Sequence, residues 1–166
     1  MPAVGFFPPA GYTPPATVQA NVPVAPTAPA STSAYKMQGL GALITPQYPA
    51  GQVLAIFQAT ATDSGTTVGE GILLQAYYGP MSAGTAVPAN AAAVPGSAVA
   101  LGPLVEWATG VTLTTAADLF QPIYVIAVAK GLIPGQQYWF DLAAESVITA
   151  SVVALTNVSV TLVEIG

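Results

Sequence analysis

The chain has no cysteine and no histidine, so two large classes of chemistry are closed to it. Without cysteine there are no disulfides, no thiolate nucleophile and no sulfur ligand for a metal. Without histidine, the most frequent general base and metal ligand is missing as well. We therefore expect no metal site and no cofactor. A cysteine-free chain is stable in any redox environment, so this absence does not fix the compartment.

Charge is the second shortage. Charged side chains make up 5% of the 166 residues, against about 25% in a typical globular protein. The formal net charge is −5, and the only cationic side chains are Lys36 and Lys130. Two separated lysines cannot neutralise a run of phosphates, so we expect no nucleic-acid partner. Anionic membrane surfaces are disfavoured for the same reason.

The seven carboxylates offer no catalytic pair. Asp141 and Glu145 are four residues apart, about 13 Å along a strand, which is too far for a glycosidase pair or a shared metal. Ser33 and Lys36 match a Ser-x-x-Lys motif, but the other elements of the penicillin-binding and β-lactamase signature are absent. No phosphate-binding or dinucleotide-binding fingerprint occurs. We therefore expect that the protein is not an enzyme.

Long hydrophobic runs are missing too, although hydrophobic residues make up 53% of the chain and the mean hydropathy is +0.63. A spanning helix needs about 20 apolar residues, whereas the best run, at 123–129, is short and β-branched and ends at Lys130. The N-terminus lacks the basic region and apolar core of a signal peptide, so we do not expect export by the general secretory route. We expect other protein to cover the excess apolar surface, in an oligomer or a shell. The alternative is a monomer kept soluble by hydroxyls and loops.

Proline divides the chain into two parts. Residues 1–35 hold eight of the sixteen prolines and no charged side chain, and proline disfavours both helix and central strand. The segment also carries aromatic and branched side chains at intervals, which disordered tails usually lack. We predict an extended arm that docks on a neighbouring protein surface, with a free tail as the alternative. The candidate binding residues of the arm are Phe6, Phe7, Tyr12, Val18, Val22 and Val24.

Residues 36–166 form the second part, a body of short strands separated by turns. Apolar or alternating runs predict strands at 53–59, 71–78, 97–107, 122–128, 136–143, 148–153 and 156–165, and residues 112–117 could be strand or connector. The strand at 97–107 is the weaker candidate, because Gly102 and Pro103 interrupt it. The uniformly apolar run at 122–128 predicts a strand buried on both faces. No stretch shows a helical period with caps. We predict an all-β fold, an antiparallel β-sandwich that is jelly-roll-like or, alternatively, immunoglobulin-like.

Trp107 and Trp139 are the only tryptophans, and two functions compete for them. They could form a sugar-stacking platform, as in carbohydrate-binding modules, or pack in the sheet core and at a protein interface. Trp139 alternates with Tyr138 and Phe140, so it points to the opposite face of the strand. We favour interface packing and take both tryptophans as candidate interface residues, with carbohydrate binding as the alternative function.

Several stretches of the body resemble a domain of tailed-phage virion proteins and their prophage-encoded homologues. The stretches are 39–46 (GLGALITP), 51–56 (GQVLAI), 69–79 (GEGILLQAYYG), 88–93 (PANAAA), 131–142 (GLIPGQQYWFDL) and 155–161 (LTNVSVT). The resemblance spans about residues 39–161, so it covers nearly the whole body but not the arm. It implies a capsid- or tail-associated β-sandwich, commonly trimeric in decoration and fibre proteins, and carries over no catalytic residue.

Together, composition and resemblance lead us to expect a structural virion protein, namely a capsid decoration (cement) protein on the exterior of the particle. Assembly would take place in the host cytoplasm. The expected partners are the major capsid protein or another virion protein, and further copies of the chain itself, with a trimer favoured. A tail- or fibre-associated binding module is the alternative.

Overall fold

The computed structural model describes residues 17–21, 34–63, 67–83, 86–108, 119–148 and 153–165. Every regular element in these ranges is a strand, as predicted, and they contain no helix long and apolar enough to cross a membrane. The strands are β1 (Thr17–Asn21), β2 (Lys36–Met37), β3 (Ala42–Ile44), β4 (Gln52–Asp63), β5 (Gly71–Pro80), β6 (Val99–Ala108), β7 (Leu119–Ala129), β8 (Tyr138–Ser146) and β9 (Val153–Ile165).

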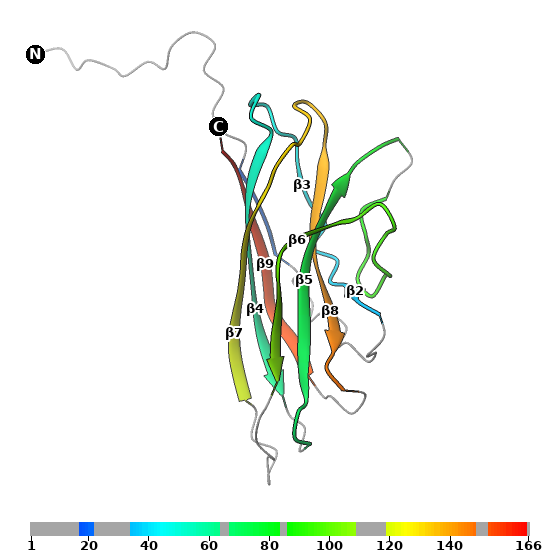
Figure 1. The fold of residues 1–166 in the computed structure, drawn as a ribbon, viewed down its shortest axis with the longest axis vertical. Helices are drawn as coiled ribbons and strands as arrows, with labels where there is room; N and C mark the ends of the chain where they lie inside the picture. The colour runs from blue at the N-terminus through cyan, green and yellow to red at the C-terminus, as the bar shows by residue number, and fades with distance from the viewer. Residues whose placement is uncertain are drawn as a thin grey trace, which may run out of the picture.

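The strands form two antiparallel sheets, with β7, β4 and β9 on one side of the molecule and β5, β8 and β2 on the other (Figure 1). Sheet A has the order β1-β9-β4-β7, and sheet B has the order β2-β8-β5-β6, with β3 also paired to β8. The first half of the chain therefore pairs back along the second half, β1 with β9, β2 and β3 with β8, β4 with β7, and β5 with β6. An antiparallel ribbon wrapped into two sheets in this way is a jelly roll. The predicted β-sandwich is confirmed.

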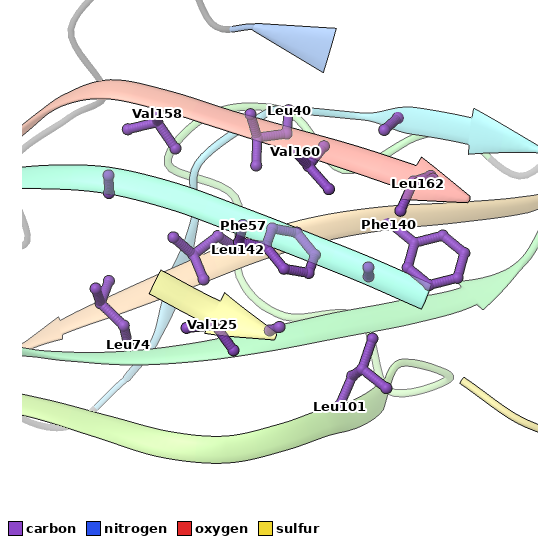
Figure 2. Close-up of a cluster of buried hydrophobic side chains, with 14 of the residues drawn as sticks. Leu40, Phe57, Leu74, Leu101, Val125, Phe140, Leu142, Val158, Val160 and Leu162 are labelled. Carbon is purple, nitrogen blue, oxygen red and sulfur yellow. The ribbon is translucent and has the colours of Figure 1, made fainter. Parts of the chain in front are cut away.

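The hydrophobic core lies between the two sheets, because the inner side of each strand is apolar at every second residue. Leu74 of β5 and Val160 and Leu162 of β9 are fully buried, on the faces that the sequence alternation predicted. Figure 2 shows side chains of both sheets, among them Phe57 of β4 and Phe140 of β8, pointing into the shared interior. Burial of this interior is the main contribution to the stability of the fold.

A bulge interrupts β6 where the sequence predicted an interruption. Gly102 and Pro103 add residues opposite Gln75 of β5, and the Nε2 of Gln75 donates a hydrogen bond to the backbone oxygen of Leu101 at 3.1 Å. The strand continues on both sides of the bulge. A Cβ at Gly102 would lie 2.7 Å from the Cβ of Ala127, so glycine lets the edge of sheet B approach β7 of sheet A closely.

Two details differ from the predicted strands. β9 is one unbroken strand, because Asn157 adopts a left-handed conformation (φ 52°) at an irregularity in its pairing with β4. Asparagine tolerates that conformation, so the strand bulges there instead of ending. Ile148 lies in a bend after β8 and not in a strand. The uncertain stretch 112–117 lies outside the described residues.

Three strands have no counterpart among the predicted ones. β2 and β3 have two and three residues, too few to show a period. β1 lies within the proline-rich segment, in a proline-free window between Pro15 and Pro23, and it forms the edge of sheet A beside β9. An edge is where flanking prolines are tolerated, because the outer side of an edge strand makes no ladder bonds.

Candidate assembly surface

β7 is the edge strand of sheet A at the end opposite to β1, and it is paired on one side only, to β4. The prediction that this strand is buried on both faces is therefore wrong. Ile123 and Val125 face the core, whereas Tyr124 and Ile126, on the other side, are 58% and 59% exposed. Phe120, on that same outer side, is 65% exposed. Because the outer residues are as apolar as the inner ones, the sequence pattern could not separate the two faces.

The open side of β7 continues across β4 and β9. The antiparallel register places outward residues of the three strands side by side, in five rows. From one end of the sheet to the other, the rows are Val128, Leu54 and Val163; Ile126, Ile56 and Thr161; Tyr124, Gln58 and Ser159; Pro122, Thr60 and Thr156; Phe120, Thr62 and Ala154. We call this surface the A-face. None of its residues is charged.

Large exposed hydrophobic side chains gather along the edge of the sandwich where β7 of sheet A lies beside β6 of sheet B. Of the seven found in the described ranges, three lie on β7 and two, Val99 and Leu104, lie on the adjacent strand β6. Soluble proteins usually protect edge strands with charged side chains or proline, and on β7 the protecting residue is Pro122. An exposed apolar patch of this kind marks a surface that another molecule covers.

The outer face of sheet B also has an apolar area, but the chain covers that area itself. Met37, Trp139 and Ala143 form a second buried cluster there, outside the core between the sheets. The loop of residues 81–98, described at 81–83 and 86–98, folds over this cluster on the side away from sheet A (Figure 1). The loop residues that pack on the cluster are Met81, Val87, Val94 and Ala98.

Backbone hydrogen bonds also attach this loop to the edge of sheet B. The N–H of Met37 donates to the oxygen of Ala92 at 2.9 Å, and the N–H of Ala91 donates to the oxygen of Met37 at 2.9 Å. Lys36 and Ala93 form a further bridge. The loop therefore supplies a pairing partner for β2, so one chain covers both this edge of sheet B and the apolar cluster on its outer face.

Both tryptophans lie within the packing of their own chain. Trp139 is 1% exposed, and its indole lies against Gly79, where an added Cβ would come within 2.8 Å of three ring atoms. Trp107 is half-buried and packs against the core between the sheets. A sugar stacks on an exposed ring face, and Trp139 offers none in the single chain.

Asp141 lies at the covered side of sheet B and has a structural role. Its carboxylate accepts hydrogen bonds from the N–H groups of Gly39 (3.0 Å), Leu40 (3.1 Å) and Leu142 (2.7 Å), which fastens the segment between β2 and β3 to β8. Burial raises the pKa of Asp141 from its usual value of 3.8 to about 7, while the three hydrogen bonds act in the opposite direction.

The other buried carboxylates also accept hydrogen bonds from the backbone. Glu164 of β9 accepts from the N–H groups of Gln47 and Tyr48 in the turn before β4. Glu70 accepts from the N–H of Thr67 at 3.0 Å. Across the described ranges, no group of three or more Asp, Glu, His or Cys residues is placed to hold a metal ion. The carboxylates that could do chemistry are thus dispersed and engaged in holding turns.

One of the six predicted arm residues, Val18, lies within the described part of the chain. Val18 belongs to β1, with its Cα opposite Leu162 of β9. The others, Phe6, Phe7, Tyr12, Val22 and Val24, lie outside the described residues.

Sequence reasoning did not single out the exposed residues of the A-face, Phe120, Tyr124 and Ile126. A usable signal was present, because three separate strands each lack charge at the alternate positions that face outward. A solvated sheet face normally carries polar and charged residues at those positions.

No protein-family model matches the chain, and no curated protein matches it. Among solved structures, the chain is similar to the structure of the infectious bursal disease virus Gx strain, with 14% identity over 100% of this chain and a TM-score of 0.37. It is also similar to the Gt strain of that virus (17% identity, 99% of this chain, TM-score 0.26) and to its VP2 subviral particle (16%, 99%, 0.22). The chain spans 38%, 47% and 46% of those chains, respectively. Likenesses this weak carry no functional weight, and the proposals below rest on the chain's own residues.

Proposed function

We propose that this protein is a structural component of a virus particle, a decoration or cement protein that binds and stabilises the outside of a tailed-phage shell. The observation that carries the proposal is the A-face, an uncharged sheet face with three large hydrophobic side chains more than half exposed. A surface of this kind calls for a protein partner. The resemblance of residues 39–161 to tailed-phage virion proteins supports the choice of partner.

In this proposal the two parts of the chain have separate roles. The sandwich, residues 36–166 joined by β1, self-associates, and we expect a trimer. The proline-rich segment 1–35 binds the major capsid protein or another virion protein. Since the segment has no charged side chain, apolar burial would drive its binding. The residues proposed to make contact are Phe6, Phe7, Tyr12, Val22 and Val24, with Val18 held in β1.

A non-enzymatic role fits the way the chain uses its acidic groups. Asp141, Glu164 and Glu70 are buried and accept backbone hydrogen bonds, so their carboxyl groups hold turns and loops in place. A protein whose carboxylates are engaged in this way is suited to a rigid shell component, because each fastened turn removes local flexibility.

Mass spectrometry of purified particles, with copy numbers, tests the virion role. We expect the chain in every particle, at a copy number comparable to that of the major capsid protein. A count in the tens or fewer would contradict the decoration role in favour of a tail or fibre position. Complete absence from particles would contradict a virion role of any kind.

Substitutions in the full chain test the arm. We expect the triple variant Phe6→Ser, Phe7→Ser, Tyr12→Ser to lose binding to shells stripped of the protein, while its self-association is unchanged. The matched control is Ala10→Ser, Ala16→Ser, which alters the same segment without removing large apolar side chains. Substitution is preferable to deletion of residues 1–34, because the deletion would also remove β1 from sheet A. Undiminished shell binding by the triple variant would contradict an arm-mediated contact.

A further inference from the structure

We infer that the A-face is the surface through which copies of this chain meet, so that it is covered by the A-face of a second copy. The inference rests on the proposed function in one respect, the expected self-association, which it deepens by naming the face involved. A face that meets its own counterpart makes a two-fold contact between two copies, so the A-face would join a pair of chains, and the expected trimer would need a different surface. The inference makes no use of the shell, so it can be tested on the purified protein alone.

The chemistry of the A-face narrows the choice of partner. Its central row is Tyr124, Gln58 and Ser159, and the neighbouring rows contain apolar and hydroxyl side chains. A charged partner surface would bury its charges without counter-charges, which is costly. A second A-face is uncharged, and it brings the same amide and hydroxyl groups, which can hydrogen-bond to their own counterparts. The A-face of a second copy is therefore chemically complementary to this surface.

The size of the A-face fits a contact between copies that dilution can reverse. Its rows run over residues 120–128 of β7, about 30 Å, and its three strands are about 14 Å wide, which gives about 420 Å² in projection. Side chains make the accessible area larger than the projected area. A stable protein–protein interface takes about 800 Å² of accessible surface from each partner, and a weak one takes less than about 600 Å². The A-face therefore provides enough area for a weak contact between two copies.

An extended segment of the chain itself is a poorer fit to the same surface. One extended strand covers a strip about 5 Å wide along the sheet, the spacing of neighbouring strands. The rows of the A-face run across three strands, β7, β4 and β9. A single arm laid on this face would leave most of each row uncovered, whereas a second sheet face covers whole rows at once.

Gln58→Glu is the decisive variant. Gln58 is exposed in the single chain and lies at the centre of the A-face, so the isosteric carboxylate would be solvated in the monomer and buried between copies. By sedimentation equilibrium of the full chain at neutral pH, we expect the wild type to associate and the variant to dissociate about tenfold more readily, or more. Near pH 4 the new carboxyl binds a proton, and we expect the association of the variant to return towards that of the wild type measured in the same buffer.

Two further variants provide controls. Val68→Asp adds a charge at a hydrophobic residue of similar exposure (55%) in the turn between β4 and β5, away from the A-face, and we expect it to associate like the wild type. Ile126→Asp places a charge in the next row of the A-face, and we expect a folded monomer by circular dichroism and sedimentation.

Three results would overturn the inference. One is a wild-type chain that stays monomeric at all accessible concentrations. Another is unchanged association of both Gln58→Glu and Ile126→Asp. The last is a monomeric wild type that associates only after the Phe6, Phe7 and Tyr12 substitutions, because the chain's own N-terminal segment would then be the cover. None of these would remove the virion proposal, which the copy-number measurement on particles tests separately.

Discussion

Both sheets of this sandwich have large apolar side chains on their outer faces, and the two faces differ in what covers these side chains. On sheet B, the loop of residues 81–98 buries Trp139 and pairs with β2, so the chain covers its own surface. On sheet A, no described segment of the chain lies over Tyr124 or Ile126, which are more than half exposed. The apolar residues that do not fit in the core of this domain are thus found in two places. Some lie under an extra layer of the same chain, and others lie on a face that another molecule can cover.

The difference extends to the placement of charge. The covered side of sheet B includes a buried carboxylate, Asp141, because the overlying segment provides the N–H groups of Gly39 and Leu40 as partners. The A-face has no charged side chain at all, although it is open to water in the single chain. A charged side chain on a surface that a partner without complementary charges covers would lose its water without gaining an opposite charge. The desolvation free energy would then weaken the association. Lack of charge on an open face is therefore a sign of assembly.

The largest effect that we expect from a single substitution comes from Trp139→Ala, on the covered face. Removing a fully buried tryptophan should lower the free energy of unfolding by about 3–5 kcal/mol and loosen the loop of residues 81–98. Urea denaturation measures this loss. The matched variant is Tyr124→Ala on the A-face, studied below the concentration at which the chain associates, where the change should stay within about 0.5 kcal/mol. Equal losses in the two variants would erase the contrast between the faces.

A smaller effect should follow from Gly79→Ala. The added methyl group would lie 2.8 Å from the indole of Trp139, which is confined between β5 and the overlying loop, so the packing must shift. We expect a loss of about 1–3 kcal/mol, as for other overpacked sites. Gly96→Ala is the control, because a Cβ there meets nothing within 4 Å, and it should be nearly neutral. A neutral Gly79→Ala would show that the cover over Trp139 is loose.

The pH dependence of stability tests the buried carboxyl of the covered side. The pKa of Asp141 is raised to about 7 in the folded protein, so the folded state holds this proton more tightly than the unfolded state. The contribution of this proton to the free energy of unfolding is fully present below about pH 4 and is lost as the pH rises through about 7. Between these values the free energy of unfolding falls by up to about 1.4 kcal/mol per pH unit. Asp141→Asn should remove this slope, and urea denaturation across that range measures it. The same slope in both proteins would assign the effect to other groups.

Much of the sandwich could be predicted from sequence because inward alternation is local information. The runs at 53–59, 71–78 and 122–128 all lie inside observed strands, and the bulge at Gly102 was visible as an interruption. The strand order was not encoded in any local pattern, since pairing depends on residues far apart. The short strands β2 and β3 were not predicted, because two or three residues are too few to show an alternating pattern.

The candidate site was harder to predict for a physical reason. An apolar run such as 122–128 indicates that both sides of a strand are shielded from water. It does not indicate whether the same chain or another molecule provides the shielding. The sequence predicted Trp139 as an interface residue and did not single out Tyr124. The structure distinguishes them, because the chain's own loop reaches Trp139 and does not cover Tyr124.

Hydroxyl-radical footprinting of the full chain at several concentrations tests most directly whether one face is covered by the chain and the other by a second copy. We expect Phe120 and Tyr124 to be protected at high concentration and to become labelled on dilution, and to be labelled at every concentration in Ile126→Asp. Trp139 should stay protected in every sample. Strong labelling of Tyr124 that does not change with concentration would contradict the covered A-face, and ready labelling of Trp139 would contradict the closed face of sheet B.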